Sequence, residues 1–222
     1  MGLGAMGTRL ARRYQYVGVE PDARSFRIAR ERIEGLTTGK VYPTTIAALP
    51  KPESFDLVCA FEVLEHIEDD ASALSKWRSV LRPRGWLLLS VPAHQRRFGP
   101  SDERVGHYRR YERTSLTRLL GQAGYTDIAI STYGFPLGFA LDFVRNRLAG
   151  MRPHRGTMAD RTAESGRTLQ PPGWLGSVVW VATLPFRALQ IPFEKTDIGT
   201  GFVVSARRRE DVDLPARADT HS

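Results

Sequence analysis

The sequence predicts an α/β fold built on a mostly parallel β-sheet, and three observations support this prediction. Short apolar runs alternate with amphipathic segments of helical length over residues 16–132. The apolar run 55–61 gives way at once to the polar stretch 62–66, as expected where a buried strand ends at the edge of a sheet. Glycine- and proline-containing turns separate these segments. Alternating strands and helices are typical of parallel sheets, which bind ligands at the carboxyl ends of their strands.

The composition is that of a globular protein with an excess of positive charge. The 222 residues are 41% hydrophobic and 25% charged, which suits a single α/β domain. Lys and Arg outnumber Asp and Glu by 32 to 24, and this excess would attract an anionic cofactor, anionic lipid or nucleic acid. The cations are scattered, which is also typical of ordinary surface charge. The one cysteine, Cys59, lies in an expected strand, and the N-terminus does not resemble a signal peptide, so we expect a cytoplasmic protein.

The N-terminal part predicts a glycine turn followed by a strand that ends in an acid. Residues 1–7 form the turn, and such a turn normally follows a buried strand. We therefore expect that a first strand is missing from this sequence. Glu20 ends the strand 16–20, where it is placed to accept hydrogen bonds from both hydroxyls of a ribose. The other elements expected in this part are helices over 8–13 and 23–33 and a weak strand over 41–45.

The centre of the chain carries polar residues at the predicted ligand edge. Glu62, Glu65 and His66 follow the strand 55–61 and would share one face if a helix begins there. The elements expected after them are a helix over 68–81, a turn over 82–85, a strand over 86–92, a polar and aromatic loop over 102–111, a helix over 114–123 and a strand over 126–132.

The last third departs from the alternating pattern. We interpret residues 134–195 as a helical lid or insertion within a single domain that spans 1–209. Its apolar run at 174–184, which Pro185 and Arg187 interrupt, is too short to cross a bilayer, which needs ~20 apolar residues, and any peripheral membrane contact would involve 174–192. This part is either a lid or core element, or a contact with a membrane surface or a greasy substrate. The remaining expectations are a helix over 135–148, a polar loop over 152–173, a closing strand over 201–207 and a disordered tail over 210–222.

Four motifs, in this order, resemble those of class I S-adenosylmethionine-dependent methyltransferases. They are Gly2-Leu3-Gly4, Glu20, the phrase EVLEH at 62–66 and the turn 82–85. The loop GHYRRY at 106–111 is similar to that of an uncharacterised bacterial branch of the family. The resemblance covers residues 1–133 and the closing strand. It implies a Rossmann-like sheet with strand order 3-2-1-4-5-7-6 and an antiparallel last strand. Without its central first strand, two neighbouring strands would keep unpaired edges.

The resemblance also implies S-adenosylmethionine as the cofactor and gives roles to particular residues. Gly2 and Gly4 would line its methionine part, and Glu20, with Pro21 beside it, would hold the ribose. Phe61 and Glu62 would form a wall of the same site. The acid that often contacts adenine after the third strand is not evident, so backbone groups and apolar contacts would hold adenine instead.

Methyl transfer to an alcohol or phenol needs a general base as well as alignment. The candidates are His107, His66 and Glu65, although both histidines are equally suited to ordering their loops. Glu62, Glu65 and His66 would also suit a divalent ion. The same phrase is equally common in relatives without a metal, so we expect none here.

The loop at 106–111 supplies candidate acceptor-binding residues. Arg109 and Arg110 are suited to grip a phosphate or carboxylate, with Tyr108 and Tyr111 on either side. The alternative is a loop that is held over the cofactor by salt bridges.

The expected function is methyl transfer to an oxygen or nitrogen of a small or lipid-like acceptor. One alternative is a non-catalytic fragment without the first strand. A nucleic-acid methyltransferase is disfavoured because the Asn/Asp-Pro-Pro-aromatic signature is absent at 60–63. A nicotinamide-dependent dehydrogenase, suggested by Gly2-x-Gly4-x-x-Gly7, lacks the strand that should precede this fingerprint. Peripheral membrane contact and the oligomeric state stay open.

Overall fold

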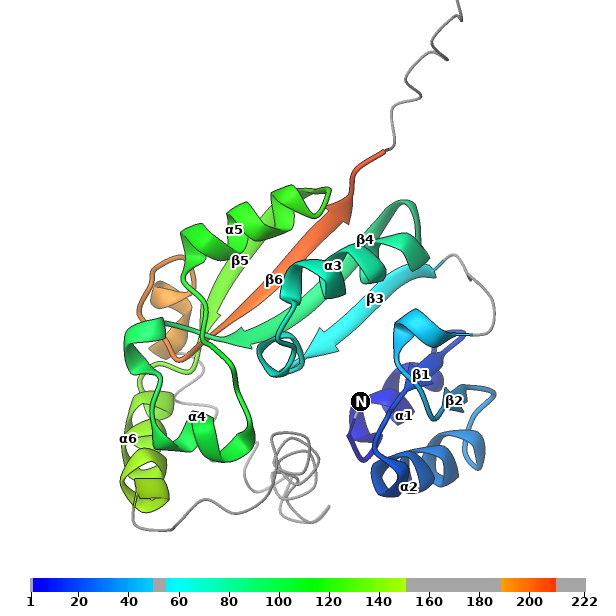
Figure 1. The fold of residues 1–222 in the computed structure, drawn as a ribbon, viewed down its shortest axis with the longest axis horizontal. Helices are drawn as coiled ribbons and strands as arrows, with labels where there is room; N and C mark the ends of the chain where they lie inside the picture. The colour runs from blue at the N-terminus through cyan, green and yellow to red at the C-terminus, as the bar shows by residue number, and fades with distance from the viewer. Residues whose placement is uncertain (1, 50–54, 151–188, 211–222) are drawn as a thin grey trace, which may run out of the picture.

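The computed structural model describes residues 2–49, 55–150 and 189–210 and confirms the α/β fold, with two sheets (Figure 1). In the first sheet, β1 (Val17–Val19) pairs in parallel with β2 (Lys40–Tyr42). The second sheet has the order β3-β4-β6-β5. Its strands are β3 (Phe55–Phe61), β4 (Leu81–Pro92), β5 (Tyr125–Tyr133) and β6 (Gly201–Arg208).

The order and the directions of the strands match those implied by the family resemblance. β3 and β4 are parallel, whereas β6 lies antiparallel to both β4 and β5. Reading β2-β1 and then β3-β4-β6-β5 reproduces the family order without its central strand. Within the described residues, β1 and β3 therefore have no hydrogen-bonded partner on the sides where that strand would lie.

All the described helices except α4 agree with the expected ranges to within a few residues. The helices are α1 (Ala5–Ala11), α2 (Ala23–Glu34), α3 (Asp70–Val80), α4 (Pro100–Val105), α5 (Arg113–Gln122) and α6 (Leu137–Gly150). Short 3₁₀ turns occupy Ile46–Ala48, Leu64–His66, Gln95–Arg97 and Ile191–Phe193. No helix in the described parts of the chain combines the length and apolar character needed to cross a membrane.

Two expectations about local structure need correction. The predicted turn 82–85 lies within β4 as an irregularity, since Leu81 pairs with Phe55 and Trp86 with Leu57, while Arg84 has a φ of +62°. The predicted loop 102–111 begins as helix α4, which Pro100 opens and which has Asp102 and Glu103 in its first turn. A proline at the start and acids in the first turn both favour a helix N-terminus. The predicted loop 152–173, the apolar segment 174–184 and the tail after residue 210 lie outside the described residues.

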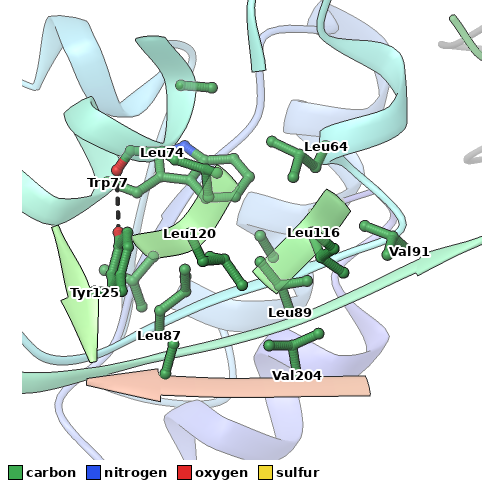
Figure 2. Close-up of a cluster of buried hydrophobic side chains, with 14 of the residues drawn as sticks. Leu64, Leu74, Trp77, Leu87, Leu89, Val91, Leu116, Leu120, Tyr125 and Val204 are labelled. Atoms are coloured by element: carbon green, nitrogen blue, oxygen red, sulfur yellow. Dashed lines mark hydrogen bonds between the residues drawn. The ribbon is translucent and has the colours of Figure 1, made fainter. Parts of the chain in front are cut away.

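One face of the second sheet forms the main core (Figure 2). Leu87, Leu89 and Val91 alternate along β4 and are fully buried beneath α3 and α5. The hydroxyl of Tyr125 donates to the carbonyl of Leu74 in α3 (3.0 Å), which satisfies this buried polar group. Each buried leucine contributes about 1.5–3 kcal/mol of burial free energy. This packing fixes the carboxyl ends of β3 and β4, where the polar residues lie.

The N-terminal unit has a smaller core of its own, made by α1, α2 and β2. Gly4 caps α1 with a φ of +81°, and a Cβ there would lie 3.0 Å from the Cα of Ala29. Glycine therefore allows α1 to approach α2 closely. This packing role was not anticipated from the sequence.

Candidate active site

Glu20 stands at the carboxyl end of β1, where backbone amides hold its carboxylate. The N–H of Gly2 donates to Oε2 (2.8 Å), and the N–H of Asp22 donates to Oε1 (3.0 Å). The side chain is buried between the glycine turn and the start of α2. The structure thus brings together Gly2 and Glu20, two of the expected cofactor-binding residues, while Pro21 is exposed beside them.

Glu62 follows β3 in a left-handed conformation, with a φ of +52°. Its Oε1 accepts hydrogen bonds from the hydroxyls of Ser90 (2.7 Å) and Tyr133 (2.9 Å). A non-glycine residue in this region is strained by about 1–3 kcal/mol and persists where surrounding contacts hold it. Phe61, the residue before it, keeps 37% of its surface exposed.

The prediction that Glu62, Glu65 and His66 share one helical face was wrong. The turn at Glu62 directs its carboxylate to Ser90 and Tyr133, and the helical turn begins only at Leu64. Instead of Glu62, His107 joins Glu65 and His66. The rings of His66 and His107 meet edge to face with centroids 4.7 Å apart.

Glu65 lies at the centre of this cluster and is fully buried. Its Oε1 is 3.9 Å from Nε2 of His66 and 3.9 Å from Nε2 of His107. Burial, together with the charges of Glu62 and Asp102, raises the pKa of Glu65 well above its usual range. Burial and the neighbouring His107 lower the pKa of His66 to about 4, against the opposing effect of the Gly106 carbonyl. His66 is therefore neutral at pH 7.

Asp102 in α4 connects the histidine cluster to the loop after it. Its Oδ1 accepts from Nδ1 of His107 (2.8 Å) and from Nε of Arg110 (2.9 Å). Burial raises the pKa of Asp102, but the hydrogen bonds from His107 and Arg110 outweigh it and hold the pKa below its usual value. Arg110 also donates to Asp142 of α6 (3.2 Å), so two carboxylates neutralise its charge.

A pocket of about 140 Å³ opens beside these groups. Its wall includes Glu62, Tyr133, His107 and Arg110. α6 contributes Asp142 and Arg145. The pocket therefore lies beyond the carboxyl ends of β3 and β4, the edge at which α/β sheets bind ligands.

Three of the four predicted acceptor-binding residues, Tyr108, Arg109 and Tyr111, do not line this pocket. Arg109 binds Asp70 (2.7 Å) and the carbonyl of Glu68, which ties the loop to the start of α3. Tyr111 is buried, and its hydroxyl donates to Asp70 (3.0 Å), so the prediction that it flanks the acceptor was wrong. Tyr108 is 39% exposed and donates its backbone N–H to the carbonyl of Glu65.

Sequence reasoning missed three groups that organise the site. Asp102 orients His107, while Ser90 and Tyr133 hold Glu62. The separation of five residues between Asp102 and His107, which spans the end of a short helix, is the one local signal that pointed to such a pair. Tyr133 comes from β5, 71 residues away from Glu62, and no local pattern marks it.

The match of its sequence to a protein family shows which family this chain belongs to. Residues 4–130, more than half of the chain, match the family described as "Methyltransferase domain". The chain belongs to this methyltransferase domain family.

The curated relatives that resemble it carry related names. A probable S-adenosylmethionine-dependent methyltransferase of Mycobacterium tuberculosis is 32% identical over 120 residues, covering 52% of this chain and 42% of the relative. A ubiquinone biosynthesis O-methyltransferase of Bradyrhizobium sp. is 36% identical over 78 residues, covering 35% of this chain and 31% of the relative. The matched parts thus span less than half the length of these relatives.

Solved structures share the fold at low sequence identity. The [4+2]-cyclase SpnF aligns with a TM-score of 0.57 and 20% identity, over 94% of this chain and 72% of that one. Phosphoethanolamine N-methyltransferase 2 of Haemonchus contortus, in complex with S-adenosyl-L-methionine, aligns with a TM-score of 0.57 and 16% identity, over 94% of this chain and 47% of that one. Because a cyclase and a methyltransferase share the fold, these likenesses define the architecture and leave the reaction to the site.

Proposed function

We propose that this chain binds S-adenosylmethionine and transfers a methyl group to an oxygen or nitrogen of a small or lipid-like acceptor. The observation that carries the proposal is the match of residues 4–130 to the methyltransferase domain family. This range contains Glu20, Phe61, Glu62 and the whole Glu65–His66–His107 cluster. The polar residues at both strand edges therefore lie within the part of the chain that defines the family.

The residues at the end of β1 fit the ribose of this cofactor. Backbone amides of Gly2 and Asp22 hold the Glu20 carboxylate at the carboxyl end of the strand. A carboxylate there accepts hydrogen bonds from a vicinal diol, as it does in other nucleotide-binding α/β folds. At the end of β3, the exposed Phe61 offers an apolar surface and Glu62 a carboxylate held in place by Ser90 and Tyr133.

When bound, S-adenosylmethionine supplies a methyl group that is activated by its sulfonium. The protein must align the acceptor and receive a proton from it. His107 lines the pocket, and its Nδ1 is held by Asp102, so Nε2 is the nitrogen that takes the proton as the acceptor oxygen gains the methyl group. Glu65 and His66 adjoin this nitrogen and keep the imidazole in position. A base placed in this way contributes roughly 10²–10⁴-fold in rate.

The size of the pocket suits the reactive group of an acceptor, and the apolar side chains of α6 suit an apolar part of the acceptor outside the pocket. Its volume of about 140 Å³ is below the roughly 300–1,000 Å³ of sites that enclose a whole drug-sized ligand. α6 lines the pocket through Asp142 and Arg145 and also exposes Leu141, Phe143 and Leu148. A lipid-like acceptor would place its reactive group in the pocket and its chain along this helix. Because Arg110 is already neutralised, it gives no preference for an anionic acceptor.

Calorimetric titration of S-adenosylmethionine tests the cofactor part of the proposal. Loss of a charge-assisted hydrogen bond costs about 1.5–3 kcal/mol, so we expect Glu20→Gln to bind roughly 10–100-fold more weakly. The matched control is Glu31→Gln, an exposed glutamate of α2, which should bind like the wild type. A form extended upstream in the gene is titrated in parallel, because β1 and β3 show unpaired edges in the described residues.

The outcomes of this titration are distinct. Failure of both the present and the extended chain to bind, with circular dichroism confirming that they are folded, would refute the proposal and favour a non-catalytic protein. Equal affinity of Glu20→Gln and Glu31→Gln would remove Glu20 from the cofactor site.

A further inference from the structure

Three possible metal ligands face one another in the Glu65–His66–His107 cluster. Nε2 of His66 and Nε2 of His107 each lie 3.9 Å from Oε1 of Glu65. The ligating atoms of the three residues all lie within 4.8 Å of one another. A distance of 3.9 Å is too long for a hydrogen bond. The two 3.9 Å contacts are therefore not hydrogen bonds, although the three residues present their possible ligand atoms to one another.

The partners of the two imidazoles determine which nitrogen carries the proton. Nδ1 of His66 lies 3.0 Å from the carbonyl oxygen of Gly106, which can only accept. Nδ1 of His107 lies 2.8 Å from Oδ1 of Asp102, a carboxylate that Arg110 also binds. Each Nδ1 therefore donates, which leaves each Nε2, on the side of Glu65, as the nitrogen available to a metal ion. Histidines that bind metals have this arrangement, with the second nitrogen donating to a carbonyl or carboxylate.

Glu65 provides an independent indication of a missing cation. It is 0% exposed, and neither carboxylate oxygen has a hydrogen-bond partner in the part of the chain that the structure describes. A buried carboxylate without partners is costly unless a positive charge or a proton offsets it. The imidazoles of His66 and His107 lie beside it, and no Lys or Arg among the described residues forms an ion pair with it.

We infer that Glu65, His66 and His107 bind a divalent transition-metal ion beside the acceptor pocket. Ion–ligand distances of about 2.0–2.2 Å place ligand atoms about 3.4 Å apart in a tetrahedral site. The observed 3.9 Å separations thus need a contraction of about half an ångström, which side-chain rotation provides. Two imidazoles and one carboxylate favour zinc, cobalt, nickel, iron or manganese over magnesium and calcium, which prefer all-oxygen ligands.

The ion changes the chemistry of the site that was proposed above. Three protein ligands leave at least one coordination position open, as in catalytic zinc sites. Since His107 lines the pocket, this position is available to an acceptor oxygen there. The ion would lower the pKa of a bound hydroxyl and replace His107 as the group that activates it. This consequence rests on the proposed function, whereas ion binding itself does not.

Cobalt binding tests the inference without cofactor or acceptor. The full chain is freed of metals with a chelator and titrated with CoCl₂ while visible absorption is recorded. We expect saturable d–d bands with one ion per chain, displaced by ZnCl₂ and unaffected by millimolar MgCl₂. Removing a ligand should cost more than the roughly 10–100-fold that loss of an outer-shell partner costs, so His66→Asn, His107→Asn and Glu65→Gln should each weaken binding beyond that range.

The controls separate this site from other histidines and from unfolding. Glu68→Gln, an exposed glutamate three residues after Glu65, should bind Co²⁺ like the wild type. His107→Cys keeps a ligand and should add a sulfur-to-cobalt band in the near ultraviolet, which an unfolded variant would not show at one ion per chain. The inference is overturned if the folded wild type shows no saturable spectrum, if the spectrum persists in the His66→Asn/His107→Asn double variant, or if magnesium displaces cobalt. Each of these results leaves the S-adenosylmethionine titration unaffected.

Discussion

Replacing Asp102 with asparagine should destabilise the protein strongly, because three donors converge on this carboxylate. Oδ1 accepts from His107 (2.8 Å) and Arg110 (2.9 Å), and Oδ2 accepts from the N–H of Gly99 (3.0 Å). Asparagine has the same shape but offers one oxygen and one NH₂ group. In either orientation at least one donor faces the NH₂ group and is left unsatisfied.

The magnitude follows from these contacts. An unsatisfied buried donor costs about 1–3 kcal/mol, and each charge-assisted bond that becomes neutral loses roughly 1 kcal/mol. Arg110 keeps Asp142 as its second carboxylate partner, which limits the loss. The expected cost is therefore about 3–5 kcal/mol, the range found when one partner of a buried ion pair is removed. This is a large part of the ~5–15 kcal/mol stability of a typical domain.

Urea unfolding, followed by the fluorescence of the buried Trp77, measures the effect. The matched control is Asp127→Asn. Asp127 pairs with Arg207 at 3.4 Å on the surface, and its φ of +49° is one that asparagine tolerates. We expect this control to change stability by at most about 0.5 kcal/mol. A loss below about 1 kcal/mol for Asp102→Asn would show that the Asp102 network does not hold this part of the protein together.

Three further variants test other parts of the structure. Gly4→Ala should lower the free energy of unfolding by about 2–4 kcal/mol, because φ is +81° and the new Cβ would lie 3.0 Å from a backbone atom of α2. Its control, Gly121→Ala, should raise this free energy by about 0.5–1 kcal/mol, because a Cβ there meets nothing within 4 Å. Equal melting temperatures for the two variants would contradict this prediction. Arg113→Lys should lower the free energy of unfolding, measured in urea, by about 2–3 kcal/mol. The reason is that the planar guanidinium donates hydrogen bonds to β5 and to the segment 196–197 at the same time. An unchanged urea midpoint would show that a lysine ammonium can replace these hydrogen bonds. Tyr133→Phe removes the hydroxyl that donates to Glu62 (2.9 Å) and should cost about 1 kcal/mol in the same assay, which a stabilised variant would disprove.

Local patterns in the sequence were sufficient to predict most strands and helices of this fold. The apolar runs at 55–61, 86–92 and 201–207 became strands, and the amphipathic segments around them became helices within a few residues. The reason is physical: the period of apolar residues decides which local structure can bury them. The placement of Glu20 at a strand end was also predictable, because it depends only on where the strand stops.

The predictions failed where residues that are distant in the sequence determine the local geometry. Glu62 turns away from Glu65 because Ser90 and Tyr133, from two other strands, hold its backbone and carboxylate. Tyr111 was expected at the acceptor but is buried, since its hydroxyl reaches Asp70 at the start of α3, 41 residues away. No pattern within a few residues records such partners.

The sequence by itself determined that polar residues follow the buried strand 55–61 and that an aromatic, basic loop lies at 106–111. Only the tertiary structure decided that His107 lies against Glu65 and His66 and that Glu62 does not. The physical reason is that α4 and the loop after it fold back across the carboxyl ends of β3 and β4. There the contacts His66–Gly106 and Tyr108–Glu65 join segments about 40 residues apart. These two contacts brought the three candidates Glu65, His66 and His107 together in one cluster.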